Sequence, residues 1–154
     1  MTKKIIGHIR SQFKKLDIDG YVVPKNDEFF SEYSKKDRLK IVSNFSGSAG
    51  YAIILKKNNY LFVDGRYNIQ AQLESGDKFK IVNYQKIINC KLFKNLKLGI
   101  NPKLFTSNQI KKFFLRYNKV KYINFDLIEK KSNKQSENIK QFYSLEDEIV
   151  GENY

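Results

Sequence analysis

Short apolar runs along this chain alternate with segments whose apolar residues recur at helical spacing. Near the N-terminus, one such set predicts an amphipathic helix over 3–16. Its members are Ile5, Ile6, Ile9, Phe13 and Leu16. The apolar run 21–23 predicts a short buried strand that Pro24 ends. Asp37 is a suitable N-cap for a short helix over 38–44.

The middle of the chain has the pattern of a β-hairpin. Apolar runs at 51–55 and 60–63 are joined by the polar turn Lys-Lys-Asn-Asn. The sequence FSGSAG precedes the first run and DGRY follows the second. Gly47 and Gly50, within FSGSAG, indicate a backbone that needs either positive φ or a close approach.

Helices and strands then continue to alternate. We expect a helix over 65–74, in which Ile69 and Leu73 are four residues apart, and a strand over 78–84 with Phe79 and Ile81 inward. The segment 85–95 is ambiguous.

The last third of the patterned region predicts strands over 96–100 and 120–123 and a helical turn over 126–130. Between the two strands, Thr106 or Ser107 caps a helix that reaches about residue 117. Its buried stripe is formed by Ile110, Phe113 and Phe114. Alternating strands and helices with one hairpin predict a single α/β domain, a mixed β-sheet flanked by helices.

The C-terminal segment differs in composition from the rest. Residues 131–141 are polar without periodicity, and 143–154 are acidic. We therefore expect one domain over 1–130, followed over 131–154 by a polar linker and the start of a connection to a further domain.

The formal net charge of +13 raises the possibility of a nucleic-acid partner. Only four of the 29 basic residues are arginines, and the lysines occur as scattered pairs rather than as one patch. A solvated surface is favoured, so we expect no nucleic-acid partner, although a stand-alone basic module that binds RNA or DNA stays open as the alternative.

Several observations favour the cytoplasm. No apolar run approaches the roughly 20 residues that span a bilayer, so we expect no membrane partner. The N-terminus lacks the apolar block of a secretory signal. The single cysteine, Cys90, fits a reducing compartment and is best interpreted as a small buried hydrophobe.

The residues that usually carry chemistry do not form a recognisable site in the sequence. His8 is the only histidine, and no Cys or second His stands at zinc-ligand spacing. The segment 47–50 could cradle an anion with its amides, but a structural turn is favoured. Asp64 and Arg66 suggest a local cap and ion pair. We expect no catalytic residue and no metal ligand in this chain.

Five segments, in their order and spacing, resemble the N-terminal, creatinase-like domain of Xaa-Pro aminopeptidases (aminopeptidase P), which are pita-bread metallopeptidases. The shared residues lie in 19–24, in Ser31-Glu32-Tyr33, in Asp37-Arg38, in FSGSAG (Phe45, Gly47, Ser48 and Gly50) and in DGRY (Asp64, Gly65 and Tyr67). Residues 98–102 also resemble a family strand end. Phe29-Phe30 departs from the family, which has a smaller, often His-containing stretch there.

The resemblance implies a ribonuclease H-like fold motif and a mechanism located elsewhere. The parent enzyme removes the N-terminal residue from short peptides with proline second. It uses two metal ions, usually manganese, on a C-terminal domain that this chain lacks. The implied roles of this chain are to pack against its own downstream domains, to contribute to a homodimer and to narrow access to the cleft. Arg66 is the candidate for a residue near the substrate cleft, and a purely local role in pinning the turn is weighed equally.

Overall fold

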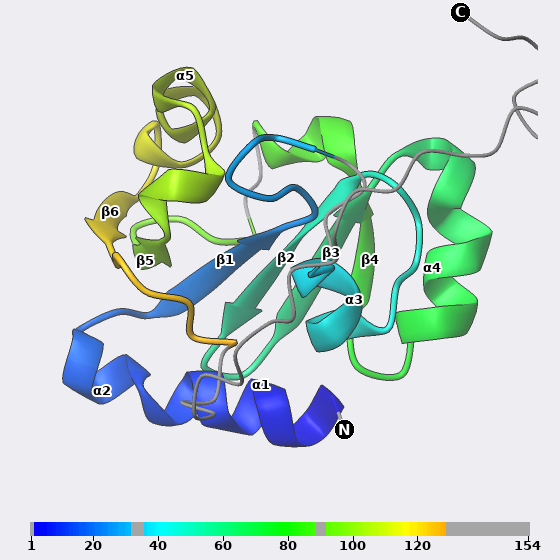
Figure 1. Cartoon of the computed structure of the whole chain (residues 1–154), viewed down its shortest axis with the longest axis horizontal. Helices are drawn as coiled ribbons and strands as arrows, with labels where there is room; N and C mark the ends of the chain where they lie inside the picture. Colours follow the sequence, from blue (N-terminus) through cyan, green and yellow to red (C-terminus); the bar gives the residue numbers. More distant parts are fainter. Residues whose placement is uncertain (1, 32–35, 89–91, 129–154) are drawn as a thin grey trace, which may run out of the picture.

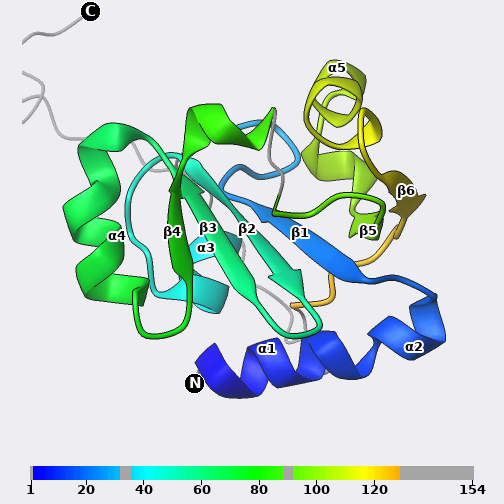
Figure 2. The same ribbon diagram turned by 180° about the vertical axis from the view of Figure 1, so that it is seen from behind.

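The computed structural model describes residues 2–31, 36–88 and 92–128. Within them, six strands form one mixed sheet in the order β4-β3-β2-β1-β5-β6, seen from its two sides in Figures 1 and 2. The strands are β1 (Gly20–Pro24), β2 (Gly50–Leu55), β3 (Asn59–Val63), β4 (Lys80–Asn83), β5 (Lys97–Ile100) and β6 (Lys119–Tyr122). This arrangement confirms the predicted mixed sheet and its hairpin.

One strand of this sheet runs against the others. β2 pairs antiparallel with both β1 and β3, whereas β1–β5, β5–β6 and β3–β4 are parallel pairs. Five strands therefore share one direction, and their carboxyl ends lie at the edge of the sheet where β2 begins.

Helices lie on both faces of the sheet and beside its outer strand β4, which confirms the predicted α/β architecture (Figure 1). The α-helices are α1 (Thr2–Ser11), α2 (Phe13–Leu16), α3 (Arg38–Ser43), α4 (Asn68–Ser75) and α5 (Ser107–Ile110). Short 3-10 turns occupy η1 (Gly65–Tyr67), η2 (Tyr84–Ile87) and η3 (Pro102–Leu104), and a π-helical turn, η4 (Lys111–Leu115), continues α5.

The single helix predicted over 3–16 is divided at Gln12 into α1 and α2. The hydroxyl of Ser11 donates to the carbonyl of His8 at 2.7 Å. The amide of Gln12 donates to Ile9 at 3.2 Å instead of to His8. A serine hydroxyl that takes the carbonyl of the preceding turn competes with the helical ladder in this way.

The capping residues act as the sequence predicts. The carboxylate of Asp37 accepts from the amide of Lys40 at the start of α3. Thr106 and Gln109 form a reciprocal capping box at α5. The predicted stripe of Ile110, Phe113 and Phe114 is buried, although its second half is π-helical.

Helix α4 turns its predicted apolar pair away from the core. The side chains of Ile69 and Leu73 are 78% and 83% exposed, whereas Ala71 and Ser75 are fully buried. The hydroxyl of Ser75 donates to the carbonyl of Ser43 at 2.7 Å, which fixes the buried face of α4 against the end of α3. The segment predicted as one helix over 65–74 is therefore the 3-10 turn η1 followed by α4, and the outer face of α4 carries two exposed apolar side chains.

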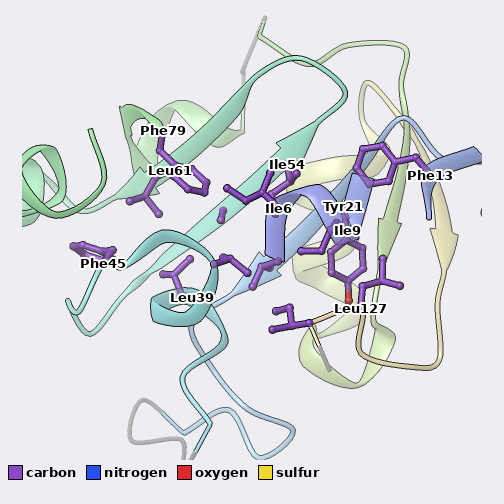
Figure 3. Close-up of a cluster of buried hydrophobic side chains, with 14 of the residues drawn as sticks. Ile6, Ile9, Phe13, Tyr21, Leu39, Phe45, Ile54, Leu61, Phe79 and Leu127 are labelled. Atoms are coloured by element: carbon purple, nitrogen blue, oxygen red, sulfur yellow. The ribbon is translucent and has the colours of Figure 1, made fainter. Parts of the chain in front are cut away.

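Two hydrophobic cores fill the two sides of the sheet. Alternate residues of one strand enter different cores: Tyr21 and Val23 contribute to one, and Val22 to the other. The first core, shown in Figure 3, lies under α1 and α3 and includes Ile9, Leu39, Phe45, Ile54 and Leu61. The second core lies under α5 and η4 and is rich in aromatic rings, among them Phe62, Phe93, Phe105, Phe113 and Phe114.

Some predictions fall partly or wholly outside the described residues. Leu127 and Ile128 form a turn, but the rest of the predicted helical turn over 126–130 is not described. Cys90 and the segment 131–154 also lie outside the described residues, so the domain boundary near residue 130 stays a prediction.

Candidate functional site at the carboxyl edge of the sheet

Both glycine-containing motifs meet at one edge of the sheet. Because β2 is reversed, its first residue Gly50 pairs with Val63, the last residue of β3. On the other side, Tyr51 pairs with Pro24, the last residue of β1. FSGSAG, DGRY and the loop that follows β1 are therefore neighbours, at the edge where α/β sheets commonly bind ligands.

The corner formed by Phe45, Gly47, Ser48 and Tyr67 is held by packing and one hydrogen bond. The ring of Phe45 is fully buried and packs edge-to-face with the ring of Tyr67 at a centroid distance of 5.7 Å. The hydroxyls of Ser48 and Tyr67 lie 2.9 Å apart. A Cβ atom on Gly47 would come within 2.2 Å of the Phe45 ring, so only glycine fits over that ring.

Gly50 is needed for the same reason. A Cβ atom there would lie 2.8 Å from the carbonyl oxygen of Phe62, which belongs to the backbone of the paired strand. Neither Gly47 nor Gly50 has φ in the left-handed region. Of the two reasons that the sequence offers for these glycines, close approach is therefore the one that applies. Gly65 differs, because a Cβ there would come no closer than 3.6 Å to Asn83.

Helix α4 holds the start of FSGSAG with a carboxylate. Glu74 accepts from the amide of Ser46 at 2.7 Å and from its hydroxyl at 2.8 Å. Gln70 donates to the Ser46 hydroxyl at 2.8 Å and to Glu74 at 3.1 Å. Burial raises the pKa of Glu74, but these hydrogen bonds outweigh it, so the pKa lies below its usual value. The anion that binds the amide of FSGSAG is thus the carboxylate of Glu74 from the chain itself. This favours a structural turn over a site for a bound anion.

The next turn directs Arg66 outward. The carboxylate of Asp64 accepts from the backbone amide of Arg66 at 3.0 Å and from its Nε at 3.1 Å. These two hydrogen bonds, the backbone one first, lower the pKa of Asp64. The side chain of Arg66 is 79% exposed. The local cap and ion pair are thus present, and whether Arg66 also reaches a substrate cleft stays a prediction.

Beside these motifs is an open hollow of about 270 Å³. Its polar and charged lining comes from Lys25, Asn26, Ser48, Asp64 and Gln109. Its aromatic lining comes from Phe30, Tyr51 and Tyr84. The hollow therefore brings Ser48, Gly50 and Asp64 of the two motifs together, and Arg66 is not among its described lining residues.

Sequence reasoning missed several of these lining residues. Lys25 directly follows β1 and Tyr84 directly follows β4, so both lie at the carboxyl ends of parallel strands. A survey of the residues just after each predicted strand would have found them. Gln109 is placed there by the α5 capping box, which the sequence indicated only as a helix start.

An ion pair and two ring stacks stiffen the lining. Lys25 is almost wholly buried, and its ammonium group forms an ion pair with Asp37, the N-cap of α3. Tyr51 stacks on Tyr84 and on Phe105 at centroid distances of 5.6 and 5.9 Å. Burial, with a smaller contribution from Tyr84, raises the pKa of Tyr51 and keeps its hydroxyl protonated.

The remaining candidates take no part in this hollow or are not described. Ser31 donates its amide to Asp27 at 2.9 Å in the loop after β1. Glu32 and Tyr33 lie outside the described residues. His8 is exposed on α1. Across 2–31, 36–88 and 92–128, no three His, Cys, Asp or Glu side chains gather where they could hold a metal ion.

No helix in the described part of the chain is long and apolar enough to cross a membrane.

Comparison with known proteins gives a consistent result. Residues 6–131 match the family described as the Creatinase/Prolidase N-terminal domain. The chain is 34% identical over 113 residues to Xaa-Pro aminopeptidase 1 of Dictyostelium discoideum, an alignment that covers 67% of this chain and 18% of that protein. The chain thus spans less than a fifth of the length of that curated relative.

Solved structures support the same fold. A cytosolic X-prolyl aminopeptidase with a di-nuclear active site from Caenorhabditis elegans superposes with a TM-score of 0.71 at 24% identity, over 83% of this chain and 25% of that chain. The N-terminal domain of the cytoplasmic peptidase PepQ from Mycobacterium tuberculosis superposes with a TM-score of 0.58 at 16% identity, over 78% of this chain and 92% of that chain. With the family match over 6–131, we conclude that the chain belongs to the Creatinase/Prolidase N-terminal domain family and is an N-terminal domain of the kind found in Xaa-Pro aminopeptidase-like proteins.

Proposed function

We propose that this chain is the non-catalytic N-terminal domain of an Xaa-Pro aminopeptidase. The parent protein releases the N-terminal residue from short peptides whose second residue is proline. The observation that carries this proposal is the family match over 6–131 combined with 34% identity to an Xaa-Pro aminopeptidase. We also propose that the parent acts in the cytoplasm, which is supported by the description of its Caenorhabditis elegans neighbour as cytosolic.

The chemistry of peptide cleavage is assigned to a following domain that carries two manganese ions. The described residues of this chain offer no trio of His, Cys, Asp or Glu side chains for a metal, so they do not fit such a pair. The part of this chain is to pack on the downstream domains, to contribute to a homodimer and to narrow the entrance to the cleft.

An exposed apolar patch supports the packing role. Ile69 and Leu73 on the outer face of α4, together with Ile81 on β4, line an open groove of about 550 Å³. Ile69 and Leu73 are exposed and Ile81 is half-buried, and neighbouring exposed apolar side chains of this kind commonly mark an interface with other protein surface.

We assign contact with the substrate peptide to the carboxyl edge of the sheet, where DGRY follows β3. Asp64 both lines the hollow and holds Arg66, so a peptide that reaches one of them is close to the other. Arg66 contacts the peptide from this edge, and its planar guanidinium suits a carbonyl or carboxylate group. None of the comparisons favours nucleic-acid binding.

A cleavage assay with and without the downstream domains tests the proposal. The purified chain 1–154 should not cleave an Xaa-Pro tripeptide, with or without manganese. The full-length parent protein should cleave it in a metal-dependent way. Metal-dependent turnover by 1–154 alone, or a full-length protein that cleaves no Xaa-Pro peptide, would overturn the proposal.

A further inference from the structure

Phe30 has a backbone conformation that is unusual for its residue type. Among the described non-glycine residues with positive φ, three are Asp17, Asn44 and Asn95, and asparagine and aspartate tolerate this region. Phe30 is the exception, with φ of 60°. A bulky residue in the left-handed region costs about 1–2 kcal/mol and persists only where its surroundings fix it.

The surroundings that fix Phe30 are hydrogen bonds to the residue three positions before it. The carboxylate of Asp27 accepts from the amides of Phe29 and Ser31, each at 2.9 Å. The carbonyl of Asp27 accepts from the amide of Phe30 at 3.2 Å. The side chain of Asn26 then ties this turn to the carbonyl of Leu104 at 3.0 Å. The strained conformation is thus built by hydrogen bonds within the loop, and the loop is anchored to η3, which follows β5.

The consequence is that two adjacent phenylalanines have different surroundings. Phe29 is 89% exposed and does not line the hollow. Phe30 is 46% exposed and is one of the lining residues, with Tyr51 and Tyr84. A glycine would adopt the same backbone conformation without strain, but it would have no ring to place at the hollow. The strained conformation of Phe30 therefore occurs at the residue that places an aromatic ring there.

The remaining lining indicates the chemistry of a ligand. Asn26, Ser48 and Gln109 are neutral and polar. The Asn26 amide nitrogen already donates to the carbonyls of Asp27 and Leu104, and Ser48 shares a hydrogen bond with Tyr67, so the oxygens of Asn26 and Ser48 can still accept from a ligand. Lys25 and Asp64 carry opposite charges, and the ammonium of Lys25 is already paired with Asp37. The described lining residues thus carry no excess positive charge of the kind that binds a phosphate or nucleotide. A volume of about 270 Å³ suits a fragment of one or two residues rather than a long peptide.

We propose that this hollow binds an apolar or aromatic side chain of a short peptide, and that Phe30 selects it. The peptide side chain packs among Phe30, Tyr51 and Tyr84, while the side-chain oxygen of Asn26 or Ser48 accepts a hydrogen bond from a peptide backbone amide. This assignment rests on the function proposed above, and it makes the hollow a subsite for a residue beyond the proline of the substrate.

A binding experiment on this chain tests the subsite without any cleavage. The chain contains no tryptophan, so the tryptophan emission of a Gly-Pro-Trp amide comes from the ligand alone and reports its binding. Saturable binding is expected, with displacement by Gly-Pro-Phe amide and none by Gly-Pro-Gly amide. Phe30→Gly should weaken binding about tenfold, since an aromatic pair is worth roughly a factor of this size.

Two controls keep the test decisive. Phe30→Gly should unfold at the same or a higher temperature than the unaltered chain, because it removes strain, so lost binding cannot be attributed to misfolding. Phe29→Ala should leave both stability and binding unchanged. The proposal is overturned if the tripeptide does not bind, if Phe30→Gly binds as tightly as the unaltered chain, or if Phe29→Ala weakens binding equally.

The full-length protein separates failure of the subsite from failure of the proposed function. There, the ratio of kcat/KM for Gly-Pro-Phe to that for Gly-Pro-Gly should exceed one and should fall towards one in Phe30→Gly. Cleavage with a ratio that Phe30→Gly does not change overturns the subsite and leaves the proposed function standing. A protein that cleaves neither peptide overturns the proposed function, and binding by the chain still decides whether the hollow takes an apolar side chain.

Discussion

The corner around Tyr67 and the turn around Arg66 are adjacent in the sequence, but the fold holds them in different ways. Tyr67 packs against the buried ring of Phe45 and shares a hydrogen bond with Ser48. Arg66 bonds to Asp64 two residues away, and its side chain is 79% exposed. The DGRY motif thus contains one residue, Tyr67, that stabilises the domain and another, Arg66, whose side chain points into solvent. Substitutions of the two residues and of their neighbours should therefore separate effects on stability from effects on activity.

The largest effect is expected at the centre of the Tyr67 corner. Phe45→Ala removes a fully buried ring that supports both Gly47 and Tyr67, and it should lower the free energy of unfolding by about 3–5 kcal/mol. Urea denaturation followed by circular dichroism measures this change. Phe29→Ala, which truncates an exposed ring of the same size, should change it by less than about 0.5 kcal/mol. Similar losses for the two variants would contradict the corner's structural role.

The glycines provide a second contrast along the same edge. Gly50→Ala places a Cβ atom 2.8 Å from a backbone carbonyl and should cost about 1–3 kcal/mol. Gly65→Ala meets nothing closer than 3.6 Å and should be neutral or stabilising by up to about 1 kcal/mol. The two variants can be compared in one thermal denaturation series. A Gly65→Ala variant that is destabilised as much as Gly50→Ala would show that the outward turn is as tightly constrained as the corner.

A smaller effect is expected from the hydrogen bond between the two motifs. Tyr67→Phe and Ser48→Ala should each lower the free energy of unfolding by about 0.5–1.5 kcal/mol, because each removes the same bond. The double variant should therefore cost about as much as either single one. Strict additivity of the two losses in denaturant titrations would mean that the two hydroxyls do not interact.

The smallest effect concerns pH and the carboxylate that holds Ser46. The pKa of folded Glu74 lies below its ordinary value of 4.5, so its contribution to stability is present above that value and is lost as the pH falls through the folded pKa. The stability gap between the unaltered chain and Glu74→Gln should narrow, by less than about 1 kcal/mol, between about pH 6 and about pH 3. A gap that widens on acidification would contradict the direction of the shift.

The sequence predicts best those features that depend on near neighbours. The alternation of 51–55 and 60–63 is enough to predict the hairpin, and Asp37 and Thr106 are recognisable caps because their partners lie three residues away. The division at Gln12 is also local, but it depends on a competition between a serine hydroxyl and a backbone amide that periodicity does not register.

The site depends instead on residues that are distant in the sequence. Glu74 reaches Ser46 across 28 positions, and Asn26 reaches Leu104 across 78. Neither pairing has a local signature, because only the reversed strand β2 brings the loop after β1, FSGSAG and DGRY to one edge. The motifs could therefore be recognised by resemblance, but the hollow between them could not be predicted before the strand order was known. The strain at Phe30 depends on the same loop anchor.

The outward role of Arg66 is most directly tested in the full-length protein with two readouts on one set of variants. Arg66→Ala should change the free energy of unfolding by less than about 0.5 kcal/mol, because its ion pair with Asp64 is exposed. It should nevertheless lower kcat/KM for an Xaa-Pro peptide by about tenfold or more, and Arg66→Lys should recover only part of the loss. Lys57→Ala, which removes another exposed positive charge, should leave both quantities unchanged. Unchanged stability together with unchanged kinetics in Arg66→Ala would contradict the account and leave Arg66 as a residue that only pins its own turn.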